Sequence, residues 1–297
     1  HLIGDMAHET FGFYPAYYYS SASLVDMILA TRLTFPEKVH LQQVALKDKW
    51  QMDGVPKNIR KKMLDMSTDG YAGAIIELLE KGFFFNLGLI DINSSYPASQ
   101  RTLPDIYGAE IITGRGKEDL PELSANDLGF ITAEVQLPER EIFSTLLVRE
   151  QDHQGKKNLN KKTLVRGAGH FITTMTFVEY EYIVQQGKKY GYEVVKDVYD
   201  WFYFKTDGTP SPYRRIIDWL YDLRLQMIAQ NNQNEHIVKT VLAGMYGKCI
   251  QTIHDHIDTE DGILFAGHDA GSWYNMFYAA YTTSMSRIRL MEMAEEI

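Results

Sequence analysis

Apolar side chains recur at intervals of three and four residues in two neighbouring segments of the last third of the sequence. The first segment contains Ile216, Ile217, Leu220, Leu223 and Met227. The second contains Ile237, Val238, Val241, Leu242 and Met245. This spacing places the apolar positions on one face of a helix, and a polar run at 231–234 separates the two segments. The pattern predicts an antiparallel αα-hairpin with arms of about 20 residues each.

Apolar, β-prone runs dominate the middle of the chain. Residues 74–79 and 83–92 flank Lys81-Gly82, which predicts a β-hairpin. Further strands are expected at 129–137, 144–149 and 192–204. The polar and basic stretch 150–166 is interpreted as a loop or a hairpin tip, and 206–212, with Gly208, Pro210 and Pro212, as a turn.

Other segments have the spacing of single helices. They are Ser23–Ala30, residues 57–66, residues 177–189, and a last helix that starts at Trp273. Residues 255–271 are expected to form a turn region that leads to this last helix. Since strands come first and a long helical hairpin and another helix follow, the predicted fold class is α+β.

Composition limits the classes of protein that the chain can represent. With 297 residues, 45% hydrophobic and 23% charged, it can bury a core of one large or two ordinary domains. The single cysteine, Cys249, excludes a disulfide framework and a multi-cysteine metal centre. The formal net charge of −9 argues against a surface that binds nucleic acid throughout. No apolar run is long enough to cross a membrane, so we expect no membrane partner and a cytoplasmic location.

The segment Gly88–Ala98 carries the most informative chemistry. An apolar strand delivers the carboxylate of Asp91, and the chain then enters a tight polar turn that contains Asn93, Ser94 and Ser95. Phosphoryl transfer needs a hard oxygen ligand for Mg²⁺ beside main-chain N–H groups for phosphate oxygens. An Asp at a strand end followed by a turn is also common without any function, so both interpretations stay open for this segment alone.

A second informative segment lies on the second arm of the helical hairpin. At about 100° per residue, Lys239, Ala243 and Tyr246 fall within about 60° of one another. One face therefore presents a cation and an aromatic ring with a small residue between them, which suits a triphosphate and a base pair. Arg224, on the first arm, could approach the same face. The alternative is a solvated lysine beside an ordinary buried tyrosine.

Together these segments resemble family B DNA polymerases. Residues 91–97 resemble the first palm motif of the family, Asp-x-x-Ser-Leu-Tyr-Pro, and residues 239–247 resemble its fingers motif, Lys-x-x-x-Asn-Ser-x-Tyr-Gly. Residues 71–74 resemble the Tyr-x-Gly-Gly element that joins the exonuclease and polymerase domains and contacts the template. The motifs occur in the family's order, and the resemblance covers roughly residues 60–297.

The resemblance implies roles for the residues of the first palm motif. Asp91 would hold two catalytic Mg²⁺ ions, with help from the carbonyl group of Ile92. Ser94 and Ser95 would offer backbone N–H groups to the triphosphate. Tyr96 would stack under the deoxyribose and exclude a 2′-hydroxyl group. The implied chemistry is in-line attack of a primer 3′-hydroxyl on the α-phosphate of a dNTP.

It also implies roles outside the palm motif. Arg224 and Lys239 would clamp the triphosphate, and Tyr246 would lie against the nascent base pair. Tyr71, Gly73 and Gly247 would contact the template. The implied partners are primer-template DNA and dNTPs, and the resemblance also allows a terminal priming protein. The implied biological role is the replication of a virus or a mobile element.

The sequence departs from the family's motifs at four positions. Ser95 stands where the palm motif has Leu, Ala243 and Gly244 stand where the fingers motif has Asn-Ser, and Ala74 replaces the last Gly of the template element. The second palm carboxylate, which in the family follows the helix after the fingers, is missing. Residues 258–261 are acidic but precede that helix, and we interpret them as a loop.

The expected domain organisation follows from the motifs. Residues 1–66 are interpreted as the end of an exonuclease-side region or a linker, and 67–205 as a palm with an insertion. Residues 206–252 would form the fingers hairpin, and 253–297 would return to the palm and stop before the second carboxylate. This portion alone is therefore expected to be inactive.

Two rival functions stay open at this point. One is an inactive, nucleic-acid-binding relic of a polymerase, which the changes at Ala243-Gly244 and the missing carboxylate suggest. The other is an unrelated Mg²⁺-dependent phosphohydrolase built on Asp91, which would not use Lys239.

Basic clusters at 60–62 and 156–166 would contact DNA in a polymerase and are otherwise solvated surface. Arg287, in a helix that resembles one of the family, could support the palm or a phosphate, or lie on the surface.

Overall fold

The secondary structure confirms the α+β class. The computed structural model describes residues 2–14, 21–42, 55–75, 82–83, 85, 92–122, 124, 126–138, 144–149, 164–259, 262–270 and 272–296. Its helices are α1 (Leu2–Phe11), α2 (Ser21–Arg32), α3 (Phe35–Gln42), α4 (Lys57–Asp69), α5 (Ser95–Arg101), α6 (Phe177–Tyr190), α7 (Tyr213–Ala229), α8 (Glu235–Cys249) and α9 (Met276–Glu295). Its strands are β1 (Glu110–Arg115), β2 (Leu128–Leu137), β3 (Leu147–Arg149), β4 (Leu164–Arg166), β5 (Gly169–Thr176), β6 (Val195–Lys205), β7 (Thr252–Thr259) and β8 (Gly262–Ala270).

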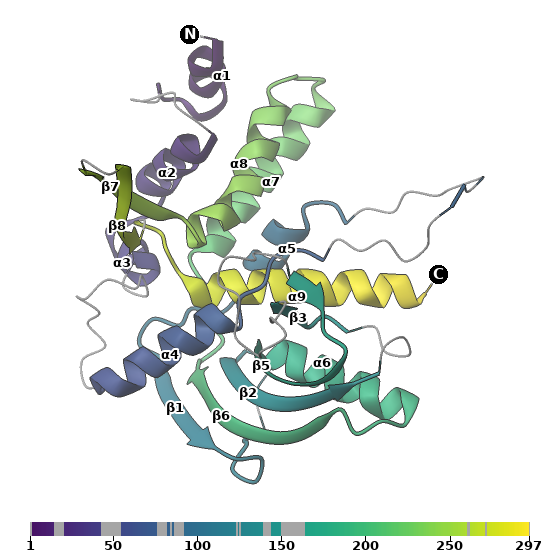
Figure 1. The fold of residues 1–297 in the computed structure, drawn as a ribbon. Coiled ribbons are helices and arrows are strands. Elements are labelled where there is room, and N and C mark those ends of the chain that lie inside the picture. Colours follow the sequence, from purple (N-terminus) through teal and green to yellow (C-terminus); the bar gives the residue numbers. More distant parts are fainter. Residues whose placement is uncertain are drawn as a thin grey trace.

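A four-stranded antiparallel sheet with the order β1-β6-β2-β5 forms the base of the molecule (Figure 1). Its central strand β2 is buried on both faces at its start and on alternate residues further along. Phe130 points to the face that α4 and the first half of α9 cover, and its neighbour Ile131 points to the face that α6 covers. Burial on both faces explains why β2 begins with consecutive apolar residues.

The predicted helical hairpin is confirmed as α7 and α8, with arms of 17 and 15 residues. The apolar positions that predicted it are buried, among them Ile216, Leu220, Val241 and Met245. Helix α9 lies between this hairpin and the sheet (Figure 1). Its buried, hydroxyl-rich side contacts α5 and α6. Because α9 also contacts α8 and β5, it connects the helical hairpin to the sheet.

Helix α2 packs against α8, and residues of α1, α2 and α3 belong to the same hydrophobic core as the α7–α8 hairpin. On α2, Val25 packs so closely against α8 that a Cβ added at Gly244 would lie 3.0 Å from its Cγ2. The buried ammonium group of Lys248 on α8 donates a hydrogen bond to Asp26 of α2. The N-terminal helices thus brace one side of the hairpin.

Several elements differ from the sequence-based expectations. The polar turn after Asp91 is short, because helix α5 begins at Ser95. Residues 255–271, expected as a turn region, contribute instead to the antiparallel strands β7 and β8, which puts Asp258 in a strand opposite Ile263. The strands β1 and β5 were not predicted, and Leu164–Arg166, expected as the end of a loop or hairpin tip, form strand β4. Most of the strands expected at 74–79 and 83–92 lie outside the described residues.

A capping box starts α3 and ties it to the hairpin. Glu37 accepts a hydrogen bond from the backbone N–H of Thr34 (2.7 Å) and two from the guanidinium of Arg215 on α7 (2.8 and 2.7 Å). The Arg215 hydrogen bond is the main cause that lowers the pKa of Glu37 from its ordinary 4.5 to about 2.

This lowered pKa predicts a pH-dependent contribution of Glu37 to stability. The contribution should be complete above the unfolded-state pKa and should disappear as the pH falls from about 4.5 towards 2, because the carboxylate then becomes protonated. At pH 7 we expect Glu37→Gln to lower the free energy of unfolding by about 1 kcal/mol. At pH 3 the difference should be smaller, as measured by urea denaturation. Glu118→Gln, in an exposed turn, is the control. A pH-independent difference would contradict this prediction.

Candidate active site

The start of α5 holds the predicted palm-motif residues. Ser94 precedes the helix in the left-handed conformation (φ 53°, ψ 40°), which is costly for a residue other than glycine and turns the chain sharply into α5. Pro97 falls in the first helical turn, where its missing N–H breaks no hydrogen bond. The carboxylate predicted to bind metal, Asp91, lies outside the described residues, and Ile92 is the nearest described neighbour.

Three tyrosines from the three predicted motifs meet in one cluster. The hydroxyl group of Tyr71 forms a hydrogen bond with the hydroxyl group of Tyr246, and the rings of Tyr246 and Tyr96 lie 4.6 Å apart at an angle of 31°. Burial, and then the hydrogen bond with Tyr71, raise the pKa of Tyr246 above its ordinary value. Burial raises the pKa of Tyr96 too. Tyr96 and Tyr246 are therefore neutral near pH 7, and the cluster connects the end of α4, the start of α5 and the end of α8.

Two predicted template residues beside the cluster leave free space. Among the described residues, no atom lies within 4 Å of a Cβ built on Gly73 or on Gly247. Gly73 follows Tyr71 by two residues, and Gly247 follows Tyr246. Packing against the described part of the chain requires neither glycine, and the absence of a side chain would let another molecule approach the backbone closely at both positions.

The predicted face of α8 is open. Lys239 and Ala243 are exposed and Tyr246 is partly buried, whereas the opposite side of the helix packs into the core through Val238, Val241, Leu242 and Met245. Arg224 of α7 is held at the N-terminal end of α8, next to the loop that joins the two helices. Its Nε donates to Glu235 at 2.8 Å, and this hydrogen bond is the main cause that lowers the pKa of Glu235.

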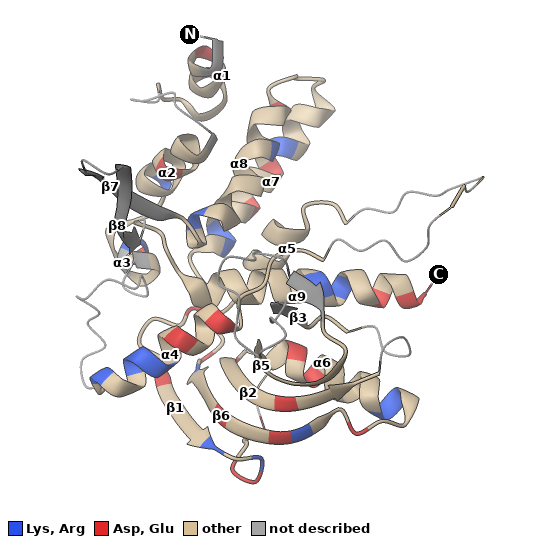
Figure 2. Ribbon diagram, viewed as in Figure 1, with Lys and Arg blue, Asp and Glu red and all other residues tan. Residues whose placement is uncertain are grey.

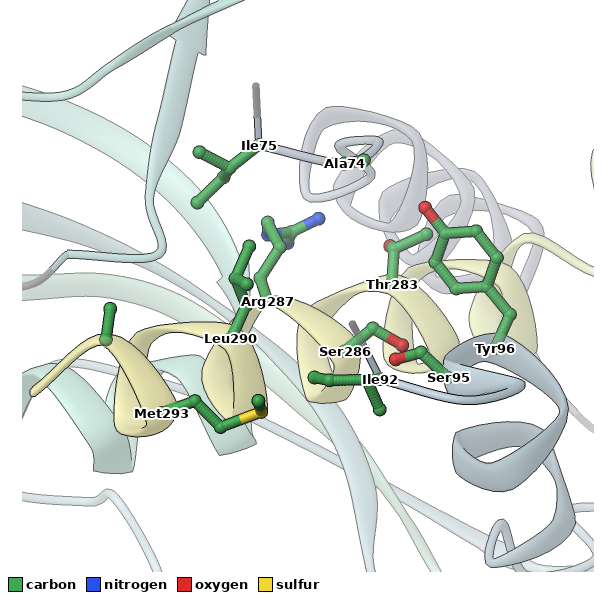
Figure 3. Close-up of a pocket in the computed structure, with 11 residues that line it drawn as sticks. Ala74, Ile75, Ile92, Ser95, Tyr96, Thr283, Ser286, Arg287, Leu290 and Met293 are labelled. Atoms are coloured by element: carbon green, nitrogen blue, oxygen red, sulfur yellow. The ribbon is translucent and has the colours of Figure 1, made fainter. Parts of the chain in front are cut away.

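A pocket of about 360 Å³ adjoins the cluster (Figure 3). Ser95 and Tyr96 of α5 form one wall, and Thr283, Ser286 and Arg287 of α9 form another. Figure 3 shows the serine hydroxyls facing each other and the Arg287 guanidinium directed towards the chain at Ala74. Within the described residues, the buried Ser95 hydroxyl has no hydrogen-bond partner.

The α9 side of this pocket was only partly predictable. The sequence suggested a supporting or a surface role for Arg287, and the structure shows that it is buried. Its ion-pair partner Glu179 was missed. The signal was present, since Glu179 lies one helical turn from Tyr182 and Ile183 on the apolar side of α6, where an unpaired carboxylate would be costly.

The basic cluster on α4 is bound to carboxylates. Lys61 pairs with Asp65 at 2.9 Å, and Lys62 donates to Asp200 of β6 at 2.8 Å. Figure 2 shows positive residues at the start of α4 and negative residues towards its end. This helix is therefore not a purely positive surface. The second basic cluster, around 156–166, lies mostly outside the described residues.

Neither a metal centre nor a membrane helix is evident in the part of the chain that the structure describes. Those residues contain no group of three or more His, Cys, Asp or Glu side chains that could bind a metal ion. Among them no helix is both long and apolar enough to span a bilayer. Asp91 is not among these residues, so the predicted Mg²⁺ site stays a prediction from sequence.

Solved structures of phi29 DNA polymerase share the fold of this chain. The complex with primer-template DNA and incoming nucleotide substrates aligns with 94% of the chain at 17% identity and a TM-score of 0.59. The orthorhombic crystal form aligns with 97% at 15% identity and 0.63, and the complex with single-stranded DNA with 99% at 15% and 0.60. The chain spans 46 to 47% of the length of those polymerase chains. No family model and no curated protein matches the sequence.

Proposed function

We propose that this chain, which has the fold of phi29 DNA polymerase, is the palm-and-fingers portion of a family B DNA polymerase. The longest natural form of the protein would catalyse template-directed transfer of a nucleotide from a dNTP to a primer 3′-hydroxyl, and this portion would supply the nucleotide site. The observation that carries the proposal is the tyrosine cluster. Tyr71, Tyr96 and Tyr246 come from three motifs that the sequence separates by up to 175 residues, and they meet beside one pocket.

The geometry supports distinct roles for the two arms of the hairpin. Lys239 is free to reach a triphosphate because it is exposed on the open face of α8. Arg224 would approach through its Nη atoms while Glu235 holds its Nε. Tyr246 would lie against the nascent base pair, with its ring orientation fixed by Tyr71 and Tyr96.

The palm-motif residues would serve the sugar and the phosphates. Tyr96 would pack under the deoxyribose and exclude a 2′-hydroxyl, and Ser94 and Ser95 would donate backbone N–H groups to the triphosphate. Asp91 and the carbonyl of Ile92 would hold Mg²⁺. When bound, Mg²⁺ would neutralise phosphate charge and favour the attacking alkoxide. Gly73 and Gly247 would let the template backbone approach, with Tyr71 beside it.

Primer extension tests the proposal. The 297-residue chain should bind primer-template DNA, and the longest natural form of the protein should add the nucleotide that the template specifies. Incorporation that follows a changed template base would support a polymerase. DNA binding without incorporation in the longest form would refute it in favour of the inactive relic.

Replacing Lys239 tests the assigned nucleotide site. We expect Lys239→Ala to weaken dNTP binding to the protein–DNA complex by at least about tenfold, because a charge-assisted hydrogen bond to phosphate contributes about 1.5 to 3 kcal/mol. Fluorescence titration with a labelled dNTP measures the change. Lys188→Ala, an exposed lysine of α6, is the matched control. Unchanged nucleotide binding in Lys239→Ala would favour the phosphohydrolase built on Asp91.

A further inference from the structure

Arg287 and Glu179 form a buried ion pair between α9 and α6. Their side chains are 3% and 2% exposed, and the Nη2 of Arg287 lies 2.6 Å from the Oε1 of Glu179. Burial of two charges is costly, and an apolar pair of similar volume would often stabilise a core equally well. Packing alone therefore does not explain why this pair occupies the centre of the molecule.

Every donor of the Arg287 guanidinium is used. Nε and Nη2 donate to Oε1 of Glu179 at 3.2 and 2.6 Å, and Nη2 donates also to the hydroxyl of Ser284 at 3.1 Å. Nη1 donates to the backbone carbonyls of Ala72 and Gly73, the latter at 2.8 Å. A guanidinium carries five N–H groups, and these contacts account for all five.

The carboxylate of Glu179 is equally well saturated. Its Oε2 accepts hydrogen bonds from the hydroxyls of Ser284 at 2.8 Å and Thr176 at 3.2 Å. These contacts orient Glu179, which in turn orients the planar guanidinium. The two Nη1 bonds are therefore aimed at the backbone segment that contains Tyr71, Ala72 and Gly73.

That segment positions the tyrosine cluster. Tyr71 directly precedes the two bound carbonyls, and its hydroxyl is bonded to Tyr246, whose ring lies against Tyr96. An apolar residue at 287 could fill the same space, but it could not bind two carbonyls of a segment without regular secondary structure. The contacts form a continuous path from Glu179 through Arg287 to the cluster.

We propose that Arg287, oriented by Glu179, is a positioning residue that fixes the Tyr71–Gly73 backbone and thereby the Tyr71–Tyr246 hydrogen bond. The consequence for the incoming nucleotide rests on the proposed function. The structural claim does not, because it concerns only contacts within the chain.

The structural claim is tested by ¹⁹F NMR of the chain labelled with 3-fluorotyrosine. The resonances of Tyr71 and Tyr246 are assigned with Tyr71→Phe and Tyr246→Phe. Arg287→Lys keeps the charge opposite Glu179 but cannot make the forked bonds, so both resonances should shift. Arg289→Lys, on the same helix, should leave them unchanged. If the Tyr71 and Tyr246 resonances have the same chemical shifts in Arg287→Lys as in the unchanged chain, the proposal is overturned.

A second variant covers the case in which Arg287→Lys does not fold. The pair Glu179→Leu with Arg287→Met removes both charges and leaves no unpaired ion. It should still move both tyrosine resonances. If this double variant folds and leaves the resonances in place, Arg287 is not a positioning residue.

The functional consequence is measured in the longest natural form. Arg287→Lys should raise the KM for the incoming nucleotide about tenfold, the value of one charge-assisted hydrogen bond, with little change in kcat. A loss of folded protein alone would lower the apparent kcat at constant KM and would count against positioning. If the unchanged form does not incorporate nucleotides, the proposed function fails, and the NMR result alone decides the role of Arg287.

Discussion

Asp91→Asn is expected to lower template-directed incorporation by the longest natural form at least about 10³-fold, while its affinity for primer-template DNA stays within about twofold. The reason is chemical, because an amide can replace a carboxylate in shape but not as a charged ligand of a hard cation. The loss corresponds to about 4 kcal/mol of transition-state stabilisation.

Asp119→Asn, in an exposed turn, is the control for this experiment. Full activity with Asp91→Asn would show that the catalytic carboxylates lie elsewhere. Since Asp91 lies outside the described residues, this prediction depends on its position in the sequence directly before Ile92 and the Ser94 turn.

Glu179→Gln should produce the largest loss of stability. The substitution leaves the buried guanidinium of Arg287 without a countercharge, and breaking a buried pair in this way costs about 3 to 5 kcal/mol. For a chain of this size we expect the Tm to fall by roughly 6 °C or more. Differential scanning calorimetry measures the change.

A neighbouring residue provides a matched control for Glu179→Gln. Glu181 lies two positions along the same helix but is exposed, so Glu181→Gln should change the Tm little. Equal Tm values for the two variants would mean that the Glu179 carboxylate is solvated rather than buried against Arg287.

The elements that the sequence predicts well are those whose apolar spacing is long and regular. The αα-hairpin and α6 follow directly from the spacing of residues such as Ile216, Leu220 and Val241, because each helix buries one continuous face. Strand β2 was predictable for a similar reason, since burial on both faces gives it a nearly unbroken apolar start.

Helix α5 shows why the rest could not be predicted. The helix is short, contains two serines and includes Pro97. These are features of a turn, yet Ser99 and Gln100 are fully buried. Ser99 shares a hydrogen bond with Ser286, and Gln100 donates to the sulfur of Cys249. Distant elements supply partners for the Ser99 hydroxyl and the Gln100 amide nitrogen, and local sequence carries no record of those partners.

The candidate site also has features that the sequence predicts and features that it does not. Helical spacing places Lys239, Ala243 and Tyr246 on one side of α8, where the first two are exposed and Tyr246 is partly buried. The Tyr71–Tyr246 hydrogen bond and the attachment of Arg224 to Glu235 depend on tertiary packing. Only the structure could reveal them.

The contact between Val25 and Gly244 bears on how the variation in the fingers motif should be interpreted. A serine at 244 would bring its Cβ within 3.0 Å of Val25, so the two positions must be compatible in size. In homologues that retain α2, a larger residue at 244 should therefore be accompanied by a smaller one at 25. The close packing of α2 on α8 thus gives the glycine a structural reason, so Gly244 is not by itself a mark of lost catalysis.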